Sequence, residues 1–309
     1  TIGGSFMKYS QLQRGLMAVA ISAAMSSPVY ATNGYFTHGI GTHSKAMAGA
    51  GDAMPTMAID VANNHASGIL VDDELNLGLA IFCPRREYSV TQSQLNGQFG
   101  AFSLDAGTVE SDNDYFPIPY AAKNWHLSDT RALTVAFYGR GGMNTEYRNG
   151  SATFDPDGPG PAPIMTLPGT FGAGVTGVNL NQAFLEVTYS FKLNENLALG
   201  IAPIFGYQMF KADGLTTFAP YTKSFAESGG TAFPAGLSNN SDDDSFGVGA
   251  KVGAIWNASP SLAFQAAYQT KISMDEFGDY SDLFAKAGNF DVPTTAKISV
   301  NFEAAAGMR

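Results

Sequence analysis

Apolar side chains alternate with polar or small ones along most of the chain from residue 75 onward. Because successive side chains of a β-strand point to opposite faces, this period of two predicts strands with one apolar and one polar face. In residues 183–192, for example, Leu185 and Val187 flank Glu186, and Phe184 is predicted to point inward as an exception. Eight segments follow the pattern, in the ranges 75–90, 114–126, 131–147, 183–192, 197–208, 246–257, 262–271 and 296–303.

The connections between these segments are alternately long and short. The long ones are 91–113, 148–178, 213–244 and 279–290, and the short ones are 127–130, 193–196 and 258–260. An up-and-down barrel in an outer membrane has short periplasmic turns and long outer loops in this order. The segments also match the tilted span of a hydrocarbon core, about 9–11 residues, better than the strands of about 5–6 residues common in soluble sandwiches. The pattern therefore favours an all-β, antiparallel transmembrane barrel.

Aromatic residues near the segment ends agree with this prediction, because membrane barrels carry aromatic girdles at both interfaces. These residues are Tyr88, Trp125, Tyr138, Tyr147, Tyr189, Tyr207, Trp256 and Tyr268.

Composition narrows the functional classes. Only 14% of the 309 residues are charged, against about a quarter in a soluble domain. The formal net charge of −10 argues against a nucleic-acid partner. The one cysteine, Cys83, excludes a disulfide scaffold and is predicted to pack within the first strand. No stretch of 18 apolar residues follows the N-terminus, so membrane-spanning helices are not expected.

The N-terminus has the features of a secretory signal. Lys8 and Arg14 precede an apolar run, and small residues at Val29 and Ala31 predict cleavage before Thr32. Residues 1–31 are therefore assigned to the signal peptide and the residues before its start. Residues 32–73 do not alternate and are predicted to be a plug inside the lumen or a periplasmic extension, and residues 74–309 are predicted to form a partial barrel.

Residues 33–42 and 44–51 resemble the N-terminus of the long-chain fatty-acid outer-membrane transporters (FadL-type), in particular the branch linked to aromatic hydrocarbons. Residues 58–66 resemble the plug motif of that family, although a histidine stands where proline is usual; the motif residues are Asn63, Asn64, His65 and Ala66. Residues 139–147 resemble the third strand of the family, where an inward kink opens the wall. The kink would depend on Gly139, Gly141 and Gly142.

This resemblance implies a monomeric barrel of 14 strands in the outer membrane of a Gram-negative bacterium, of which about eight are visible here. We therefore expect the sequence to be truncated at its C-terminus. The resemblance further implies passive uptake of fatty acids or aromatic hydrocarbons, with outer-membrane lipid around the barrel. Substrate would pass from a groove between the second and third long outer loops to a lumenal pocket, and then leave through the kink.

Candidate substrate-binding residues lie in the long loops and on the polar faces of the strands. Clustered apolar groups in water-facing loops usually mark a binding site, although they could instead pack on one another as a lid. The apolar candidates are Ile164, Met165, Leu167, Phe171, Phe218, Tyr221, Phe225, Phe233 and, near the plug, Phe36. Arg140 and Lys251 could bind a fatty-acid carboxylate, or they could pair with lumenal acids such as Glu186 or Glu146.

Other functional classes have less support. The sequence offers no nucleophile, base and orienting group that the strands would bring together, so it is not expected to be an enzyme. The four histidines are scattered, and neither a metal site nor a cofactor is expected. Two alternatives stay open: a structural or adhesive outer-membrane barrel that transports nothing, and a secreted soluble β-protein.

Overall fold

The computed structural model of the chain describes residues 36–91, 102–157, 160–284 and 288–302. The predicted signal peptide and its cleavage site lie outside these residues. The chain divides into two compact units, residues 1–36 and 37–309, and the architecture that follows is that of the second unit.

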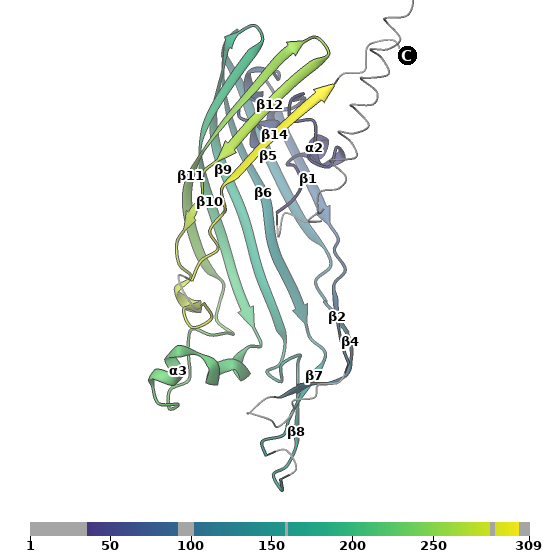
Figure 1. Ribbon diagram of the computed structural model, residues 1–309, viewed down its shortest axis with the longest axis vertical. Coiled ribbons are helices and arrows are strands. Elements are labelled where there is room, and N and C mark those ends of the chain that lie inside the picture. Colours follow the sequence, from purple (N-terminus) through teal and green to yellow (C-terminus); the bar gives the residue numbers. More distant parts are fainter. Residues whose placement is uncertain (1–35, 92–101, 158–159, 285–287, 303–309) are drawn as a thin grey trace, which may run out of the picture. The chain divides into compact units, whose positions relative to one another are not determined.

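One large antiparallel sheet dominates this unit (Figure 1). Its eight consecutive strands are β1 (Leu75–Phe82), β5 (Phe116–Ser128), β6 (Arg131–Tyr147), β9 (Thr176–Asn194), β10 (Leu197–Asp213), β11 (Asp243–Ser259), β12 (Leu262–Gln269) and β14 (Thr295–Phe302). Each pairs with the next along the chain, and the short β13 (Ser273–Met274) pairs with β11. Within the described residues the sheet is open, with β1 and β14 at its edges. The predicted up-and-down antiparallel wall is confirmed.

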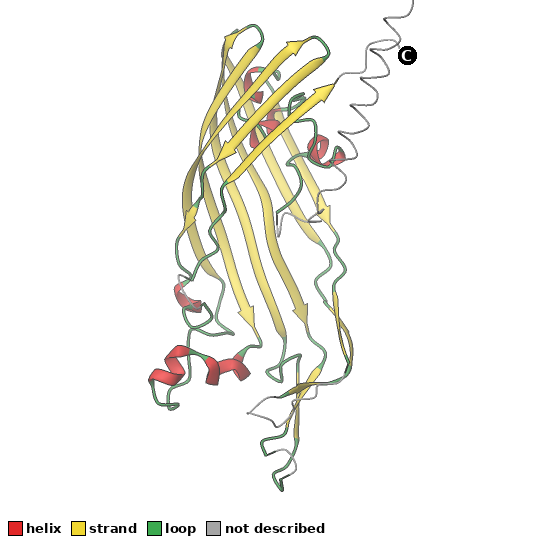
Figure 2. Cartoon of the chain, in the orientation of Figure 1, coloured by secondary structure: helices red, strands yellow, loops and turns green. Residues whose placement is uncertain are grey.

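The long connections carry small elements of their own at the end of the sheet opposite the short turns (Figure 2). In the first two loops, β2 (Glu87–Val90) pairs with β4 (Gly107–Glu110), and β7 (Ser151–Phe154) pairs with β3 (Ser103–Leu104) and β8 (Met165–Pro168). The third loop contains the 3₁₀-helix η3 (Thr216–Tyr221) and the helix α3 (Lys223–Glu227), and the fourth contains η4 (Gly278–Tyr280). No helix in the described part of the chain is both long and apolar enough to cross a membrane.

The first predicted strand is shorter than expected. Residues 75–90 were predicted as one segment, but β1 ends at Phe82 and β2 belongs to a separate two-stranded sheet. Pro84 lies in the break and cannot donate a backbone hydrogen bond to a neighbouring strand. Cys83 is exposed and outside the strand, so the prediction that it packs there was wrong.

The two faces of the sheet differ as the alternation predicted. On β11, Val248 and Val252 point outward and are 66% and 47% exposed, whereas Lys251 and Ile255 are buried on the inner face. Phe184 is 1% exposed on the inner face of β9, so the predicted exception is confirmed. The outer face is therefore apolar along its strands, and much of the inner face is polar or small.

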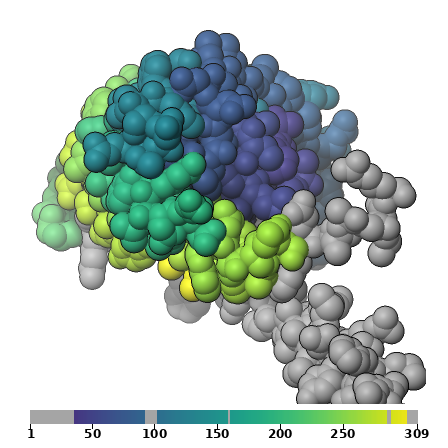
Figure 3. Space-filling model, turned by 90° about the horizontal axis from the view of Figure 1, so that it is seen from above, coloured from purple at the N-terminus to yellow at the C-terminus, as the bar shows by residue number. Residues whose placement is uncertain are grey.

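Residues 37–74, called here the N-terminal segment, pack against the inner face of the sheet near the short turns (Figures 1 and 3). The segment contains the short helix α2 (Thr42–Ala46) and the 3₁₀-helices η1 (Ala58–Ala62) and η2 (Ser67–Ile69). Apolar side chains of η1 and η2 are almost fully buried, and Ala66 and Ile69 pack with Ala132, Ala198 and Ile255 of the wall. Burial of these apolar groups holds the segment inside the curved sheet.

Candidate functional site

The predicted plug motif is the point at which the N-terminal segment is fixed to the wall. The side-chain amide of Asn64 donates to the Gln265 side chain at 2.7 Å and to the backbone carbonyl of Ala254 at 3.2 Å. Its carbonyl oxygen accepts a hydrogen bond from the backbone N–H of Ala66, which closes the turn. The backbone carbonyl of His65 accepts a hydrogen bond from the Ser190 hydroxyl at 2.6 Å. One turn thus contacts strands β9, β11 and β12.

Two glycines of the wall allow this close approach. Gly200 and Gly253 are register partners on β10 and β11. A Cβ atom on Gly200 would lie 1.9 Å from the His65 carbonyl oxygen, and one on Gly253 would lie 2.3 Å from Asn64 Oδ1. No side chain larger than hydrogen fits at either position without displacing the turn. The sequence signal was present as small residues on the polar faces, but it did not indicate which ones contact the N-terminal segment.

Asn63 and Asn124 hold the segment on either side of that turn. The Asn63 amide exchanges two hydrogen bonds with the backbone of Ile40, each 3.0 Å long. Asn124 on β5 donates to the carbonyls of Gly68, Val71 and Asp72 at 2.9–3.2 Å. Because buried polar groups are costly unless they are hydrogen-bonded, these satisfied amides specify one position of the segment against the wall.

Lys251 lies in a buried polar cluster directly beneath the plug motif. Its ammonium group contacts Glu186 Oε2 at 2.8 Å, the Tyr138 hydroxyl at 2.7 Å and the carbonyl of Ala62 at 3.4 Å. The Tyr138 hydroxyl also donates to Glu186 Oε2 at 3.0 Å. Of the two roles considered for Lys251, the geometry is that of a pair with a lumenal acid. Tyr138, expected in an interface girdle, instead points inward and is fully buried.

His65 borders this cluster without joining its hydrogen bonds. Its Nε2 atom lies 3.7 Å from Glu186 Oε2, which is longer than a hydrogen bond. Burial lowers the pKa of His65 from its ordinary value. The imidazole is therefore neutral at physiological pH, and Lys251 is the cation that balances Glu186.

A β-bulge lies at the glycine-rich stretch of β6. Gly139 pairs with Ala183 and Gly141 pairs with Gln182, so Arg140 is an extra residue on β6. The carbonyl of Arg140 accepts a hydrogen bond from the backbone N–H of Thr37 at 2.9 Å. Its guanidinium donates to Gln269 Oε1 on β12 at 2.8 Å. The bulge thus connects the third wall strand to both the N-terminal segment and a distant strand.

The pairing of β5 with β6 ends at the same place. The last register pair is Tyr120 with Tyr138, although β5 continues to pair with β1, and β6 with β9, well beyond it. We call the unpaired stretch, between residues 116–119 of β5 and 139–144 of β6, the ladder break. Beyond the ladder break, the residues that precede β5 contact β6 again, where Asn113 donates to Asn144 Oδ1 at 2.8 Å.

Two prolines explain why the ladder breaks on this side of β5. The N–H of Asn124 donates to the carbonyl of Glu74, so N–H groups of even-numbered residues in this part of β5 point toward β1 and those of odd-numbered residues toward β6. Pro117 and Pro119 are odd-numbered and have no N–H to offer β6. The glycines of β6 were identified from the sequence, whereas these prolines were not.

The long-loop end holds an aromatic pocket of about 710 Å³, called here the outer pocket. The third long loop contributes Phe218 and Tyr221 of the predicted residues. The fourth loop, rather than the predicted second, supplies the opposite side with Phe277, Leu283 and Phe284. These three were missed, although the apolar side chains of that loop were visible in the sequence.

The remaining candidates are spread around this end of the sheet. Phe171 packs edge-on against Phe218 with ring centroids 5.1 Å apart, which brings the second loop next to the third. Three candidates, Ile164, Met165 and Leu167, lie in or beside β8 and are exposed. Phe233 is exposed and Phe225 in α3 is half-buried. Phe36 is half-buried and belongs to the first unit of the chain.

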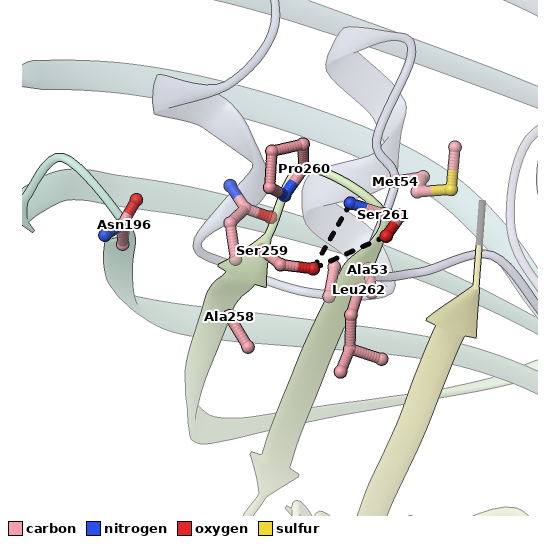
Figure 4. A pocket seen from close by; sticks show the side chains of 10 residues that line it. Ala53, Met54, Asn196, Ala258, Ser259, Pro260, Ser261 and Leu262 are labelled. Carbon is pink, nitrogen blue, oxygen red and sulfur yellow. Dashed lines mark hydrogen bonds between the residues drawn. The ribbon is translucent and has the colours of Figure 1, made fainter. Parts of the chain in front are cut away.

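A second pocket of about 510 Å³ lies at the short-turn end (Figure 4). Ala53 and Met54 of the N-terminal segment form one side, and residues 257–263 around the β11–β12 turn form the other. Its lining contains few large apolar groups and, unlike the outer pocket, no aromatic ring.

The similar solved structures include two toluene transporters and a FadL homologue. The toluene transporter TodX of P. putida matches with a TM-score of 0.58 and 15% identity, over 87% of this chain and 68% of that one. The toluene transporter TbuX of Ralstonia pickettii matches with a TM-score of 0.52 and 16% identity, over 76% of this chain and 58% of that one. A FadL homologue of Pseudomonas aeruginosa matches with a TM-score of 0.44 and 18% identity, over 72% and 49%.

The chain therefore spans about half to two thirds of the length of these structures. At such identities the likeness shows a shared fold, and the predicted FadL-type fold is confirmed at that level. No protein-family model matches the sequence, and no curated protein sequence matches it.

Proposed function

We propose that the protein is an outer-membrane transporter through which hydrophobic molecules enter the cell by diffusion. Substrate collects in the outer pocket, passes along the inside of the wall and leaves sideways through the ladder break. The observation that carries this proposal is the coincidence of three features at one place: the bulge at Arg140, the end of the β5–β6 ladder and the contact with the N-terminal segment.

The outer face of the sheet supports a location in a membrane. Its strands expose large apolar side chains such as Leu77, Ile201 and Val248, each more than half exposed. A water-facing sheet would pay heavily for such a surface, whereas the lipid-facing side of a membrane barrel requires it. The names of TodX and TbuX as toluene transporters point to the same environment and to hydrophobic cargo.

The N-terminal segment supports a lateral exit over an axial one. It fills the inner side of the wall near the short turns and is held there by the hydrogen bonds of Asn63, Asn64 and Asn124. A plug fixed in this way blocks passage along the barrel axis. A hydrophobic molecule that leaves through the wall also avoids the aqueous periplasm and enters the apolar layer directly, which is favourable by about 25 cal/mol per Å² of apolar surface.

The outer pocket suits the first step of this route. Its aromatic side chains can bury part of an alkyl chain or ring, each contributing about 1.5–3 kcal/mol when fully buried. The pocket is partly open to solvent, so we expect weak binding and rapid release. Weak binding is what a diffusive pathway needs, because a tightly held molecule would not move on.

Deletion of Arg140 tests the route. Gly139 and Gly141 already pair with consecutive residues of β9, so removing the extra residue restores a regular ladder and straightens β6. We expect uptake of a radiolabelled hydrophobic compound by whole cells to fall toward that of cells lacking the protein. The variant Arg140→Ala keeps the extra backbone residue, and comparison with it separates the bulge from the side chain. Equal loss in both variants would contradict a role for the bulge.

An adhesive barrel without transport is the second candidate, and the β8 region favours it. Ile164 and Met165 are 63% and 49% exposed at the far end of the long loops, where they could contact another surface. This function predicts that Ile164→Ser/Met165→Ser weakens attachment of cells to a hydrophobic surface and leaves uptake unchanged. Transport predicts no dependence of attachment on these two residues.

A further inference from the structure

Lys251 could bind a substrate carboxylate on the inner face of the wall, but its ammonium group already has a full set of hydrogen-bond acceptors. An ammonium group has three hydrogens to donate. Those of Lys251 face three acceptors, Glu186 Oε2, the Tyr138 hydroxyl and the carbonyl of Ala62. The side chain is 2% exposed, so a substrate carboxylate could bind it only by displacing Glu186.

Glu186 is held where such a carboxylate would otherwise bind. Its side chain is fully buried, and Oε2 accepts hydrogen bonds from both Lys251 and Tyr138. The neighbouring His65 is neutral and adds no second positive charge. The Glu186–Lys251 pair therefore carries no net charge, and an incoming anion would find one carboxylate already in place and an ammonium group whose charge is already balanced.

Two other cations on the inner side also have partners. Arg140 donates to Gln269, and Lys297 of β14 forms an ion pair with Asp52 of the N-terminal segment. The first contact joins two strands of the wall, β6 and β12, and the second joins the wall to the N-terminal segment. These basic groups are thus used to hold the structure together.

The charges around the outer pocket also disfavour an anionic molecule relative to an uncharged one. Among the described residues, its lining includes three acidic side chains, Glu227, Glu276 and Asp282, and one basic side chain, Lys223. Lys223 lies 3.4 Å from Glu227, so among the described lining residues Glu276 and Asp282 have no basic partner. A negatively charged head group would be repelled where an uncharged hydrocarbon would not be.

We propose that Glu186 determines the substrate class of the pathway: it acts as a built-in carboxylate that excludes acid-bearing molecules and leaves uncharged hydrophobic molecules as the substrates. This inference rests on the proposed transport function and specifies it. In this proposal Glu186 is a specificity-determining residue, and Tyr138 positions its carboxylate against Lys251.

Equilibrium binding to the purified protein in detergent tests the inference without depending on transport. The probes are palmitate, at mildly alkaline pH where it is an anion, and its uncharged methyl ester. The proteins are the wild type, Glu186→Ala and the double variant Glu186→Ala/Lys251→Met. The single variant frees the ammonium and the space of the carboxylate, whereas the double variant frees the space alone.

We expect the wild type to bind the ester at least as tightly as the acid. Glu186→Ala should bind palmitate about tenfold tighter or more than the wild type does, since hydrogen bonds between charged groups are among the strongest in proteins. The double variant should lose this gain, and the ester should bind all three proteins alike. A wild type that prefers the acid, or a folded Glu186→Ala that gains no affinity for it, would overturn the inference.

If Glu186→Ala does not fold, the affinities of the wild type for the acid and the ester still test the inference. Glu186→Gln then provides a variant of the same shape. Failure of the proposed function would be visible separately, as absence of uptake of an uncharged compound by cells that carry the folded wild-type protein.

Discussion

At the scale of single residues, the stability of the buried Glu186–Lys251 pair depends on the groups that surround it. Both side chains are almost completely buried, and removing a charge from water costs several kcal/mol unless its partners restore the lost interactions. Here the Tyr138 hydroxyl and the Ala62 carbonyl complete the contacts of the Lys251 ammonium, whereas among the described residues Glu186 Oε1 has no hydrogen-bond partner. The Ala62 contact also ties the cluster to the N-terminal segment, so loss of one charge would disturb both the wall and the segment.

Replacing Lys251 should therefore be far more costly than replacing an exposed lysine. We expect Lys251→Met to lower the free energy of unfolding by about 3–5 kcal/mol, because it leaves Glu186 buried without a cation. The double variant Lys251→Met/Glu186→Gln should recover most of the loss. Lys223→Met is the control, since its ion pair on α3 is largely exposed and is worth about 0–1 kcal/mol. Urea unfolding in lipid vesicles provides the measurement, and equal losses at Lys251 and Lys223 would refute this account.

The sequence indicated the chemistry of this cluster but not its arrangement. Lys251 was considered either as a ligand for a substrate carboxylate or as a partner of a lumenal acid such as Glu186, and alternation of faces placed both on the inner side. Their pairing depends on the register of three strands and on the position of the N-terminal segment, neither of which a local pattern encodes. Tyr138 was misassigned for the same reason, because an aromatic residue near a segment end suits an interface and a lumen equally well.

At the scale of elements, close approach between the N-terminal segment and the wall depends on two glycines. Gly200 and Gly253 lie side by side on β10 and β11, and the backbone of residues 64–65 passes directly over them. Backbone atoms cannot yield as the end of a flexible side chain can. The segment must therefore move if either glycine gains a side chain.

Gly200→Ala should loosen the N-terminal segment while leaving the wall intact. The added methyl group would lie 1.9 Å from the His65 carbonyl oxygen, a contact that forces displacement at a cost of about 1–3 kcal/mol. We expect larger or more frequent channel openings in planar lipid bilayers. Gly278→Ala is the control, because no atom lies within 4 Å of the new methyl group. Unchanged conductance in Gly200→Ala would show that the segment does not block the lumen.

The regular elements were predictable from the sequence, and the irregular ones were predictable only in part. All eight long strands follow from the period of two, because an apolar outside and a polar inside impose it along the whole of a strand. The glycine-rich stretch indicated the bulge in β6. The ladder break also needs Pro117 and Pro119 on the facing strand, and their effect is visible only once the pairing direction of β5 is known. Likewise, the outer pocket joins loops that are distant in the sequence.

At the scale of the whole molecule, the wall separates an apolar outside from an inside lined by polar and small groups. Val252, near the middle of β11, is 47% exposed on the outer face, and the adjacent Lys251 is buried on the inner one. Such a division makes sense for a sheet whose outer solvent is lipid. The TodX and TbuX structures share this fold, and the chain covers 68% and 58% of their lengths.

An arginine substitution on the outer face tests whether this face contacts lipid. We expect Val252→Arg to lower the free energy of folding into lipid bilayers by about 2–4 kcal/mol, the cost of a cation near the bilayer midplane. The control is Leu193→Arg, a 62% exposed position beside the short β9–β10 turn, which should cost about 0–1 kcal/mol. Folding into vesicles can be followed by heat-modifiable mobility on gels. Similar costs at the two positions would indicate that the outer face is not embedded in lipid.

The central claim, lateral passage through the ladder break, can be tested most directly by closing the break reversibly. Ile118 Cγ2 lies 2.9 Å from the position of a Cβ atom on Gly139, so cysteines at these two positions face each other across the break. With Cys83 replaced by serine, Ile118→Cys/Gly139→Cys should take up an uncharged hydrophobic compound under reducing conditions, lose uptake when the disulfide forms and regain it on reduction. Uptake that persists with the break cross-linked would contradict the account.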